Sequence, residues 1–579
     1  MPCLSHGTST RRFQFHPRLR QALRVTGALT ALALTLSGGW TSQLRAQEPA
    51  AGMVAPAPVV DTIIIVRSNV FTEEEVESSG FFRLMNSIHV TTKEWLIRDY
   101  LLFEAGQPFD AAEVAESERK LRAKHLFRAL SIDSVRLEDG RLAVRIESQD
   151  GWSLKPKFAL SIASSGDWTG ALGMNEINLL GTGNQVYLAY VKEIDRDGLN
   201  TTVDFDRMLG SEIDFQLNYA GMSDGKNGNW ITGIPFRNSE STRNLEWDGL
   251  SANQDVFRYR NELDPDGTVL DTTIYRRDAF VNNLTGALAT RHSPDDYLRF
   301  GAVAGVRKEE FYLPTTDGAV PDDSVYGTIG GWAEFSEIEY LTLHRFNAFS
   351  TEDLDLGKTV RLTATLAPDA FGWQGTGVAL GIKASGGSKA FGGRGWAWAD
   401  VEANYQWGGV AQDSGRIVIN VAGGFKPTDR QSTAVQVQLG RLWNQKPGDE
   451  FDLGFESAPR GWPAHSFVGN RMWWTTIEHR VYAVDDFLGI IGIGFAGFID
   501  YGGAWYDDQG SRRGGSTGIG LRLGSAVSSV AATTRIDLTY NFGADLDSAG
   551  ASRMALVFGS GFAFPRRTIP VISYKAQAP

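Results

Sequence analysis

The fold of this chain is decided by stretches such as IDLTYNF at residues 536–542, in which apolar and polar side chains alternate. Successive side chains of a β-strand point to opposite faces of a sheet, so this stretch predicts a strand with one apolar and one polar face. The same period of two recurs in residues 203–205, 213–219, 360–366, 401–407, 435–439 and 554–564. The larger part of the chain is therefore expected to be amphipathic β-structure.

Two architectures produce such strands. A soluble β-sandwich turns the polar face to water, whereas a transmembrane barrel turns the apolar face to lipid and the polar face to a wet lumen. The pattern persists for about 400 residues, which is too long for one sandwich. Aromatic residues also gather near strand ends, as they do in the interfacial girdles of barrels, at Trp396, Trp398, Trp407, Trp443, Trp473, Trp474 and Trp505. At roughly 25 residues per strand and connection, we expect a transmembrane antiparallel β-barrel of about sixteen strands over residues 151–564.

The composition excludes several classes of protein. The 579 residues carry 56 basic and 68 acidic side chains, and six of the arginines lie in the first 46 residues, where no acidic residue occurs. The remainder is strongly acidic, unlike a nucleic-acid-binding protein. Cys3 is the only cysteine, which excludes a disulfide scaffold and a cysteine-rich zinc protein. The apolar runs after Gln47 are too short or too rich in glycine to predict a membrane-spanning helix.

The N-terminus is typical of a secretory signal peptide. Arginines cluster within residues 11–24, residues 25–36 are largely apolar, and Ala46 is a small residue suited to cleavage. We predict a signal peptide over residues 1–46 and an Ala/Pro-rich linker over residues 47–60. A membrane anchor is the alternative, although the apolar run is shorter than the roughly 20 residues that span a bilayer.

Residues 61–150 predict a small α+β domain. A β-branched run at residues 62–67 indicates a strand, and helical spacing of apolar residues follows at 91–102 and 109–127. Two further strands are expected at 129–137 and 142–147, joined by a tight turn at Asp139-Gly140. The order β-α-α-β-β fits either a protein-binding module or a spacer.

Several short motifs occur in a fixed order along the chain. Residues 102–110 (LFEAGQPFD) and 116–122 (ESERKLR) fall in the small domain, and residues 178–184 (NLLGTGN) stand near the start of the barrel part. The tripeptide 460–462 (RGW) follows in a long connection, with Glu478 and Asp500 in later strands. This ordered set resembles the BamA/TamA superfamily of outer-membrane assembly barrels, also called bacterial surface antigens, over nearly all of the chain after the signal peptide.

The resemblance implies a domain organisation. Residues 61–150 would be a single periplasmic POTRA-like domain, residues 151–564 the outer-membrane barrel and residues 565–579 a C-terminal tail. The first strand would lie near residues 185–191 and the last at residues 554–564. A last strand at residues 568–574 is the alternative, although Pro570 weakens it. The first-strand motif of the family corresponds to Asn178, Leu179, Gly181, Gly183 and Asn184.

The family's arginine–glycine–aromatic motif lies on a long extracellular loop that folds back into the barrel. Carried over, Arg460, Gly461 and Trp462 form this loop motif, and Arg460 bridges Glu478 and Asp500 on the inner wall. A guanidinium offers donors in a rigid fork that can serve carboxylates bidentately, which lysine cannot do. A carboxylate inside a barrel needs such a partner. The alternative is that Arg460 is an exposed loop arginine.

The resemblance also implies a function at the bacterial outer membrane. The chain would assist the insertion, assembly or translocation of other proteins, and its POTRA-like domain would receive unfolded client proteins by β-augmentation. Outer-membrane lipids and periplasmic accessory proteins are the other expected partners, and nucleic acid is not one. A passive channel or a structural surface antigen without insertase activity is the alternative, because only one POTRA-like domain is expected and a fold does not fix a function.

We expect neither an enzyme nor a cofactor or metal site. Residues 492–497 (GIGFAG) match the spacing of a dinucleotide-binding motif, and residues 514–518 (GGSTG) match that of a nucleophile elbow. The first leads into an expected strand instead of a helix, and the second lies in an expected turn. Both matches are best explained by chance in a glycine-rich chain.

Overall fold

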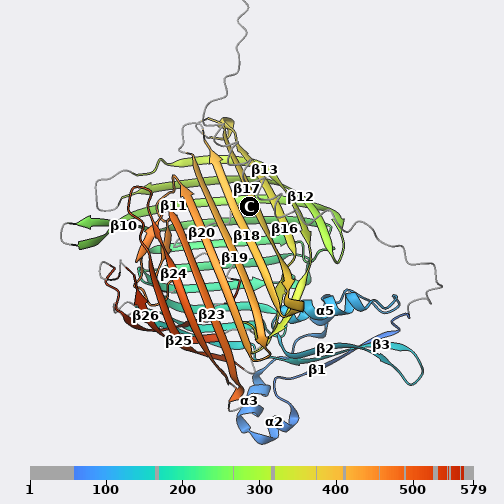
Figure 1. The fold of residues 1–579 in the computed structure, drawn as a ribbon. Helices are drawn as coiled ribbons and strands as arrows, with labels where there is room; N and C mark the ends of the chain where they lie inside the picture. Colours follow the sequence, from blue (N-terminus) through green and yellow to red (C-terminus); the bar gives the residue numbers. More distant parts are fainter. Residues whose placement is uncertain are drawn as a thin grey trace, which may run out of the picture. The chain divides into compact units, whose positions relative to one another are not determined.

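The computed structural model shows a small α/β module followed by a closed β-barrel (Figure 1). It describes residues 58–565, except 163–167, 265–266, 314–319, 373–374, 409–412, 456, 488–490, 526–532, 544–545, 547–548 and 561–562. The predicted signal peptide, most of the predicted linker, the alternative last strand and most of the predicted tail lie outside the described residues. Within the described part of the chain, every helix is too short or too polar to cross a membrane.

The module is a three-stranded sheet with four helices. Its strand order is β1–β3–β2, in which β1 runs parallel and β2 antiparallel to β3. The helices predicted at 91–102 and 109–127 are present but shorter, and the two helices that follow β1 are not among the predictions. In chain order the elements are β1 (Thr62–Ser68), α2 (Glu73–Ser78), α3 (Gly80–Ile88), α4 (Glu94–Asp99), α5 (Ala111–Ala123), β2 (Phe127–Arg136) and β3 (Leu142–Asp150).

The module has its own hydrophobic core, to which α5 contributes one face. The Asp110 side chain caps this helix by accepting a hydrogen bond of 2.7 Å from the backbone N–H of Ala112. Val114 and Leu121 lie seven residues apart, which places both on the buried face of the helix. They pack in one cluster with Ile97 of α4 and with buried residues of β2 and β3, among them Ile132, Val144 and Ile146.

The barrel sheet contains twenty strands, so the prediction of about sixteen is wrong. That prediction allowed roughly 25 residues per strand and connection, whereas only two residues separate β8 from β9. The strands are β4 (Leu154–Ile162), β5 (Trp168–Leu179), β6 (Asn184–Lys192), β7 (Asp197–Phe205), β8 (Asp214–Met222), β9 (Gly225–Ile234), β10 (Arg243–Asp264), β11 (Gly267–His292), β12 (Asp296–Tyr312), β13 (Ser324–Glu337), β16 (Lys358–Ala367), β17 (Gly377–Ala390), β18 (Gly395–Trp407), β19 (Ser414–Thr428), β20 (Gln431–Trp443), β23 (Arg471–Phe487), β24 (Ile491–Trp505), β25 (Gly514–Ser525), β26 (Thr533–Phe542) and β27 (Met554–Ser560).

The first strand of the barrel lies earlier in the chain than predicted, although it falls inside the predicted range 151–564. The expected first strand at 185–191 lies within β6, because β4 and β5 precede it in the sheet. Pro156 and two flanking lysines interrupt the apolar pattern of β4, which hides this strand in the sequence. At the other end, β27 occupies the first part of the predicted last strand, and it adjoins β4 to close the barrel.

The exposure of the strand residues shows which face of the sheet points outward. In β20, Val435 and Leu439 are 40% and 47% exposed, whereas Gln436 and Gln438 between them are fully buried. The sheet therefore turns its apolar residues outward and its amide side chains inward. A soluble sandwich or barrel has the opposite arrangement, whereas a barrel surrounded by lipid has this one.

Two long connections fold into the barrel from opposite ends. Consecutive barrel strands are antiparallel, so successive connections alternate between the end where β4 begins, here called the module end, and the opposite loop end. The connection from β20 to β23 lies at the loop end and contains β21 (Phe451–Leu453) and β22 (Phe467–Gly469). The connection from β13 to β16 lies at the module end and contains the hairpin of β14 (Tyr340–His344) and β15 (Thr351–Asp355).

Candidate functional site: the arginine loop and the inner wall

The connection between β20 and β23, here called the arginine loop (residues 444–470), is packed inside the barrel. Trp462 is fully buried, donates a hydrogen bond of 3.1 Å from Nε1 to the carbonyl oxygen of Gly515, and contacts the ring of Phe467 at 4.8 Å between centroids. Trp474 and Met472 of β23 join the same buried cluster. This apolar packing holds the loop against the inner wall and fixes the position of the neighbouring Arg460.

Arg460 is fully buried and makes a fork of charge-assisted hydrogen bonds with Asp500 of β24. Its Nε lies 2.6 Å from Asp500 Oδ2 and its Nη2 lies 2.8 Å from Asp500 Oδ1. Its Nη1 lies 2.7 Å from Glu478 Oε2 on β23. The guanidinium also stacks 3.5 Å from the centroid of the Phe498 ring. The structure thus brings together the three residues that the resemblance placed in one bridge.

The bridge is part of a larger buried ion network on the inner wall. Arg480 Nε and Arg522 Nε donate to Glu478 Oε1 at 2.7 and 3.1 Å. Arg522 Nη1 and Arg535 Nη1 donate to Asp537 at 2.6 and 3.0 Å. Four arginines and three carboxylates therefore share one site, and each of these residues is at most 3% exposed. The members of the network are Arg460, Arg480, Arg522, Arg535, Glu478, Asp500 and Asp537.

The sequence contained a signal for two members of this ion network that were not predicted, Asp537 and Arg535. Asp537 stands in the quoted stretch 536–542 on the polar side of the alternation, which is the inward side. Arg535 lies two residues before Asp537 on the same face, and Arg480 lies two residues after Glu478 on the same face. Charged residues on the lumen side of adjacent strands need partners. Charged residues that recur at every second position on this side therefore indicate an ion network even without a motif.

Gly461 allows the loop to approach the wall closely. Its φ of +80° lies in the left-handed region, and a Cβ there would stand 2.3 Å from Thr539 Oγ1. Its carbonyl oxygen accepts a hydrogen bond of 2.7 Å from Asn541 Nδ2 of β26. The motif therefore combines a charged anchor, a backbone that fits against β26 and a buried indole.

The predicted first-strand motif is instead the turn between β5 and β6, and it joins the barrel to the module. Asn178 Nδ2 donates to Thr92 Oγ1 of the module at 2.8 Å, and Asn178 Oδ1 accepts from the Gly183 N–H at 2.8 Å. Gly181 has a φ of +75°, and its carbonyl oxygen accepts from the Lys93 N–H at 2.8 Å. The other two motif residues, Leu179 and Asn184, end β5 and begin β6.

A second contact between module and barrel lies beside this turn. Lys124, which caps the C-terminus of α5, binds the Asp206 carboxylate in the connection after β7. Burial alone would lower the pKa of Lys124, but the attraction of Tyr100 and Asp206 outweighs it and raises the pKa to about 12. The lysine is therefore charged at neutral pH, and it forms an ion pair with Asp206 across the contact.

The β14–β15 hairpin, which the sequence did not reveal, reaches the same network from the module end. At its tip the carbonyl oxygen of Phe346 accepts hydrogen bonds from Tyr482 Oη at 2.5 Å and Ser432 Oγ at 2.9 Å. Arg480 Nη1 donates to the Asn347 carbonyl oxygen at 3.0 Å, while its Nε holds Glu478. Arg480 therefore connects the hairpin to the bridge of Arg460.

The base of this hairpin contacts the module. Arg122 Nε of α5 lies 3.1 Å from Asp353 Oδ2, and the guanidinium of Arg119 lies 3.9 Å from the centroid of the Tyr340 ring. Phe564, just after β27, is buried against the tip, where its backbone N–H donates to Asn347 Oδ1 at 2.8 Å. Module, hairpin and arginine network thus form one chain of contacts.

The site contains no evident means of holding a metal ion. Within the described ranges, no group of three or more histidine, cysteine or acidic side chains is arranged to bind one. The carboxylates of the network are already bound to guanidinium groups. Its chemistry is that of structural ion pairing.

The fold is similar to several solved structures, all at low sequence identity. The chain is similar to CdiB from Escherichia coli at 10% identity, over 90% of this chain and 93% of that chain, with a TM-score of 0.45. It is similar to BamA from Haemophilus ducreyi lacking POTRA domains 1–3 at 10% identity, over 86% and 84%, with a TM-score of 0.35. It is similar to the FrpB iron transporter from Neisseria meningitidis in its apoprotein form at 9% identity, over 76% and 87%, with a TM-score of 0.35.

No protein-family model matches the sequence, and no curated protein matches it either. Likenesses at such identities and TM-scores do not identify a function. The function has to be inferred from the residues of the barrel and the module.

Proposed function

We propose that this chain is a bacterial outer-membrane barrel that assists the insertion, assembly or translocation of other proteins. The observation that carries the proposal is the buried bridge from Arg460 to Asp500 and Glu478, since it reproduces the geometry that the motif resemblance implies. The outward apolar face of the strands supports contact with membrane lipids. The predicted signal peptide supports export, with the module in the periplasm.

The module supplies a surface on which an unfolded client can bind. Its sheet order β1–β3–β2 leaves β2 at an edge, paired only with β3 among the described strands. Residues 133–136 of this strand are exposed. An exposed edge offers unpaired backbone groups to an extended segment of another protein. In this proposal the client adds a strand to β2 before it enters the membrane, and further periplasmic proteins assist at the same module.

A passive channel or a surface antigen without insertase activity is the competing function. The arginine loop and the β14–β15 hairpin occupy the lumen from both ends, so the described conformation favours a closed barrel over an open channel. No catalytic step is part of the proposal, and no cofactor is required for it.

Client binding at β2 is expected to be detectable by site-specific photocrosslinking. A benzoylphenylalanine in place of Ser134 on the exposed edge should crosslink a urea-unfolded outer-membrane barrel protein and leave the same protein unlabelled once it is folded. The matched control places the reagent at Asp139, which is exposed in the turn beyond the end of β2. Equal adduct yields at Ser134 and Asp139 would show that the edge does not select clients.

A further inference from the structure

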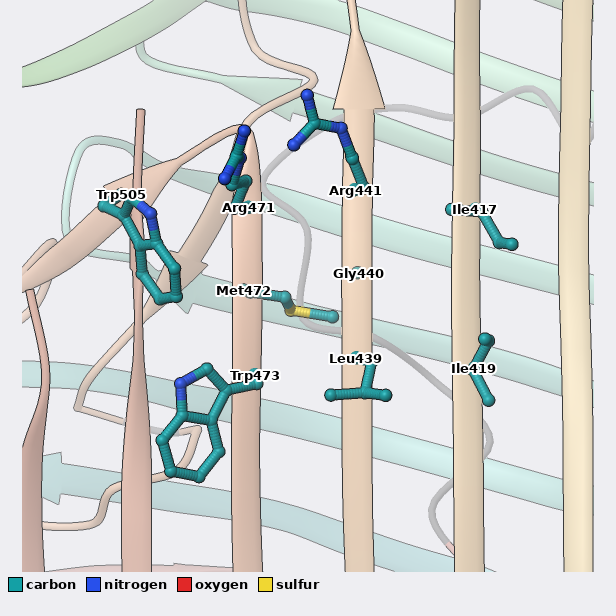
Figure 2. A pocket seen from close by; sticks show the side chains of 9 residues that line it. All are labelled: Ile417, Ile419, Leu439, Gly440, Arg441, Arg471, Met472, Trp473 and Trp505. Atoms are coloured by element: carbon teal, nitrogen blue, oxygen red, sulfur yellow. The ribbon is translucent and has the colours of Figure 1, made fainter. Parts of the chain in front are cut away.

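An outward groove at the loop end of the barrel combines an apolar floor with two arginines at its rim (Figure 2). It has a volume of about 300 Å³ and crosses β19, β20, β23 and β24. The register places Ile417, Arg441, Arg471 and Trp505 in one row across these strands, and Ile419, Leu439 and Trp473 in the row beneath it. The groove faces away from the arginine network described above.

Among the described residues, the two arginines at the rim of this groove share a single carboxylate. Arg441 and Arg471 are directly opposite each other on adjacent antiparallel strands, where like charges destabilise a sheet. Both guanidinium groups share one carboxylate, that of Asp507, which lies 3.0 Å from Arg441 Nη2 and also contacts Arg471 Nε. Two cations and one anion leave a net positive charge, and the side chains are 32% and 43% exposed, so an external anion can reach them.

The floor of the groove indicates what kind of molecule carries that anion. Leu439 is 47% exposed on the outward face, and Ile419 and Trp473 lie beside it on the neighbouring strands. In a barrel surrounded by lipid, such a surface contacts acyl chains, whereas arginines at strand ends reach the headgroups. Trp505 in the row of the arginines and Trp473 in the row beneath it are typical of the interface between the two.

We propose that this groove binds a phosphate-bearing lipid of the leaflet at the loop end. One acyl chain lies over Ile419, Leu439 and Trp473, and the phosphate accepts hydrogen bonds from Arg441 and Arg471. A guanidinium can donate two hydrogen bonds to one phosphate. A zwitterionic lipid gains less from this interaction, because the cation of its own headgroup competes with the guanidinium for the phosphate. This inference rests on the proposed placement of the barrel in a membrane, but it does not depend on any assistance given to client proteins.

The test is native mass spectrometry of the full mature chain in detergent micelles, titrated with dioleoyl phosphatidic acid or dioleoyl phosphatidylcholine. The wild type is expected to retain phosphatidic acid at least about tenfold more tightly than phosphatidylcholine. The double variant Arg441→Gln/Arg471→Gln is expected to lose this preference. The matched control is Arg243→Gln/Arg291→Gln, which removes two exposed arginines that each have a carboxylate of their own, Glu212 and Asp296.

Two further arms separate a lipid site from a simple anion site. Leu439→Gln keeps both arginines but makes the floor polar, and it is expected to weaken binding of phosphatidic acid. Millimolar inorganic phosphate is expected not to displace the lipid. Displacement by phosphate, equal retention of both lipids by the wild type, or unchanged binding in Arg441→Gln/Arg471→Gln would overturn the proposal. Heat-dependent gel mobility reports folding of each variant, and the absence of clients makes the result independent of any insertase activity.

Discussion

Replacing Arg460 with alanine is expected to destabilise the folded barrel by about 3–5 kcal/mol, the range found when one partner of a buried ion pair is removed. The change leaves Asp500 fully buried without the fork that holds both of its oxygens. It also removes the contact with Glu478 and the stacking on Phe498. Urea titration of the barrel in micelles, followed by tryptophan fluorescence, measures the free energy of unfolding.

Two controls make this expectation specific to the fork. Arg460→Lys keeps a charge but serves one oxygen at a time, so it is expected to recover less than half of the lost stability. Arg361→Ala removes another inward-facing arginine, whose ion pair with Glu334 is longer at 3.5 Å and partly exposed, and it is expected to cost less than about 1 kcal/mol. If Arg460→Ala destabilises the barrel no more than Arg361→Ala does, the bridge does not anchor the arginine loop.

The double variant Phe346→Ala/Phe349→Ala is expected to release the β14–β15 hairpin from the inner wall. Phe346 is 2% exposed and packs edge-on against Trp396 at 5.5 Å between centroids, and Phe349 packs in the same way on Tyr482 at 5.1 Å. Truncating one buried phenylalanine costs about 3–5 kcal/mol. A loss of 3 kcal/mol already changes the ratio of docked to released hairpin by roughly 150-fold.

Release of the hairpin can be measured by thiol labelling. Ala348 lies at the tip and is 2% exposed. A cysteine at this position would be the single cysteine of the mature chain, and it should react slowly with a water-soluble maleimide in the otherwise unchanged chain and at least about tenfold faster in the double variant. Phe391→Ala is the control, because Phe391 lies in a module-end turn and is 72% exposed. Equal labelling rates in all three proteins would mean that the two rings do not hold the hairpin.

The parts of the fold that the sequence predicted are those with a regular pattern. Alternation over residues 435–439 and 536–542 reported strands correctly, because each residue on the lumen side is polar and each one on the lipid side is apolar. The strand number was wrong because short turns such as that between β8 and β9 leave little sequence signal, and because Pro156 obscures β4. A pattern reports the face of a strand better than it reports where the strand ends.

The site was predictable only where a local motif marked it. Arg460, Glu478 and Asp500 were placed together by resemblance, and Phe498, whose apolar ring shares the inward face with Asp500, is explained by its stacking under the guanidinium. The β14–β15 hairpin was missed because its strands are five residues long and its contacts join residues more than 80 positions apart. Such pairings follow from the closure of the barrel, which no local stretch of sequence contains.

The measurement that tests the central claim most directly is the folding rate of a urea-unfolded outer-membrane barrel protein added to liposomes that contain the purified mature chain. The proposed function predicts faster folding than in empty liposomes and a smaller acceleration with Arg460→Ala at equal amounts of inserted protein. A rate equal to that of empty liposomes, with the wild-type chain shown to be folded, would contradict the account and favour a passive channel or a structural surface protein.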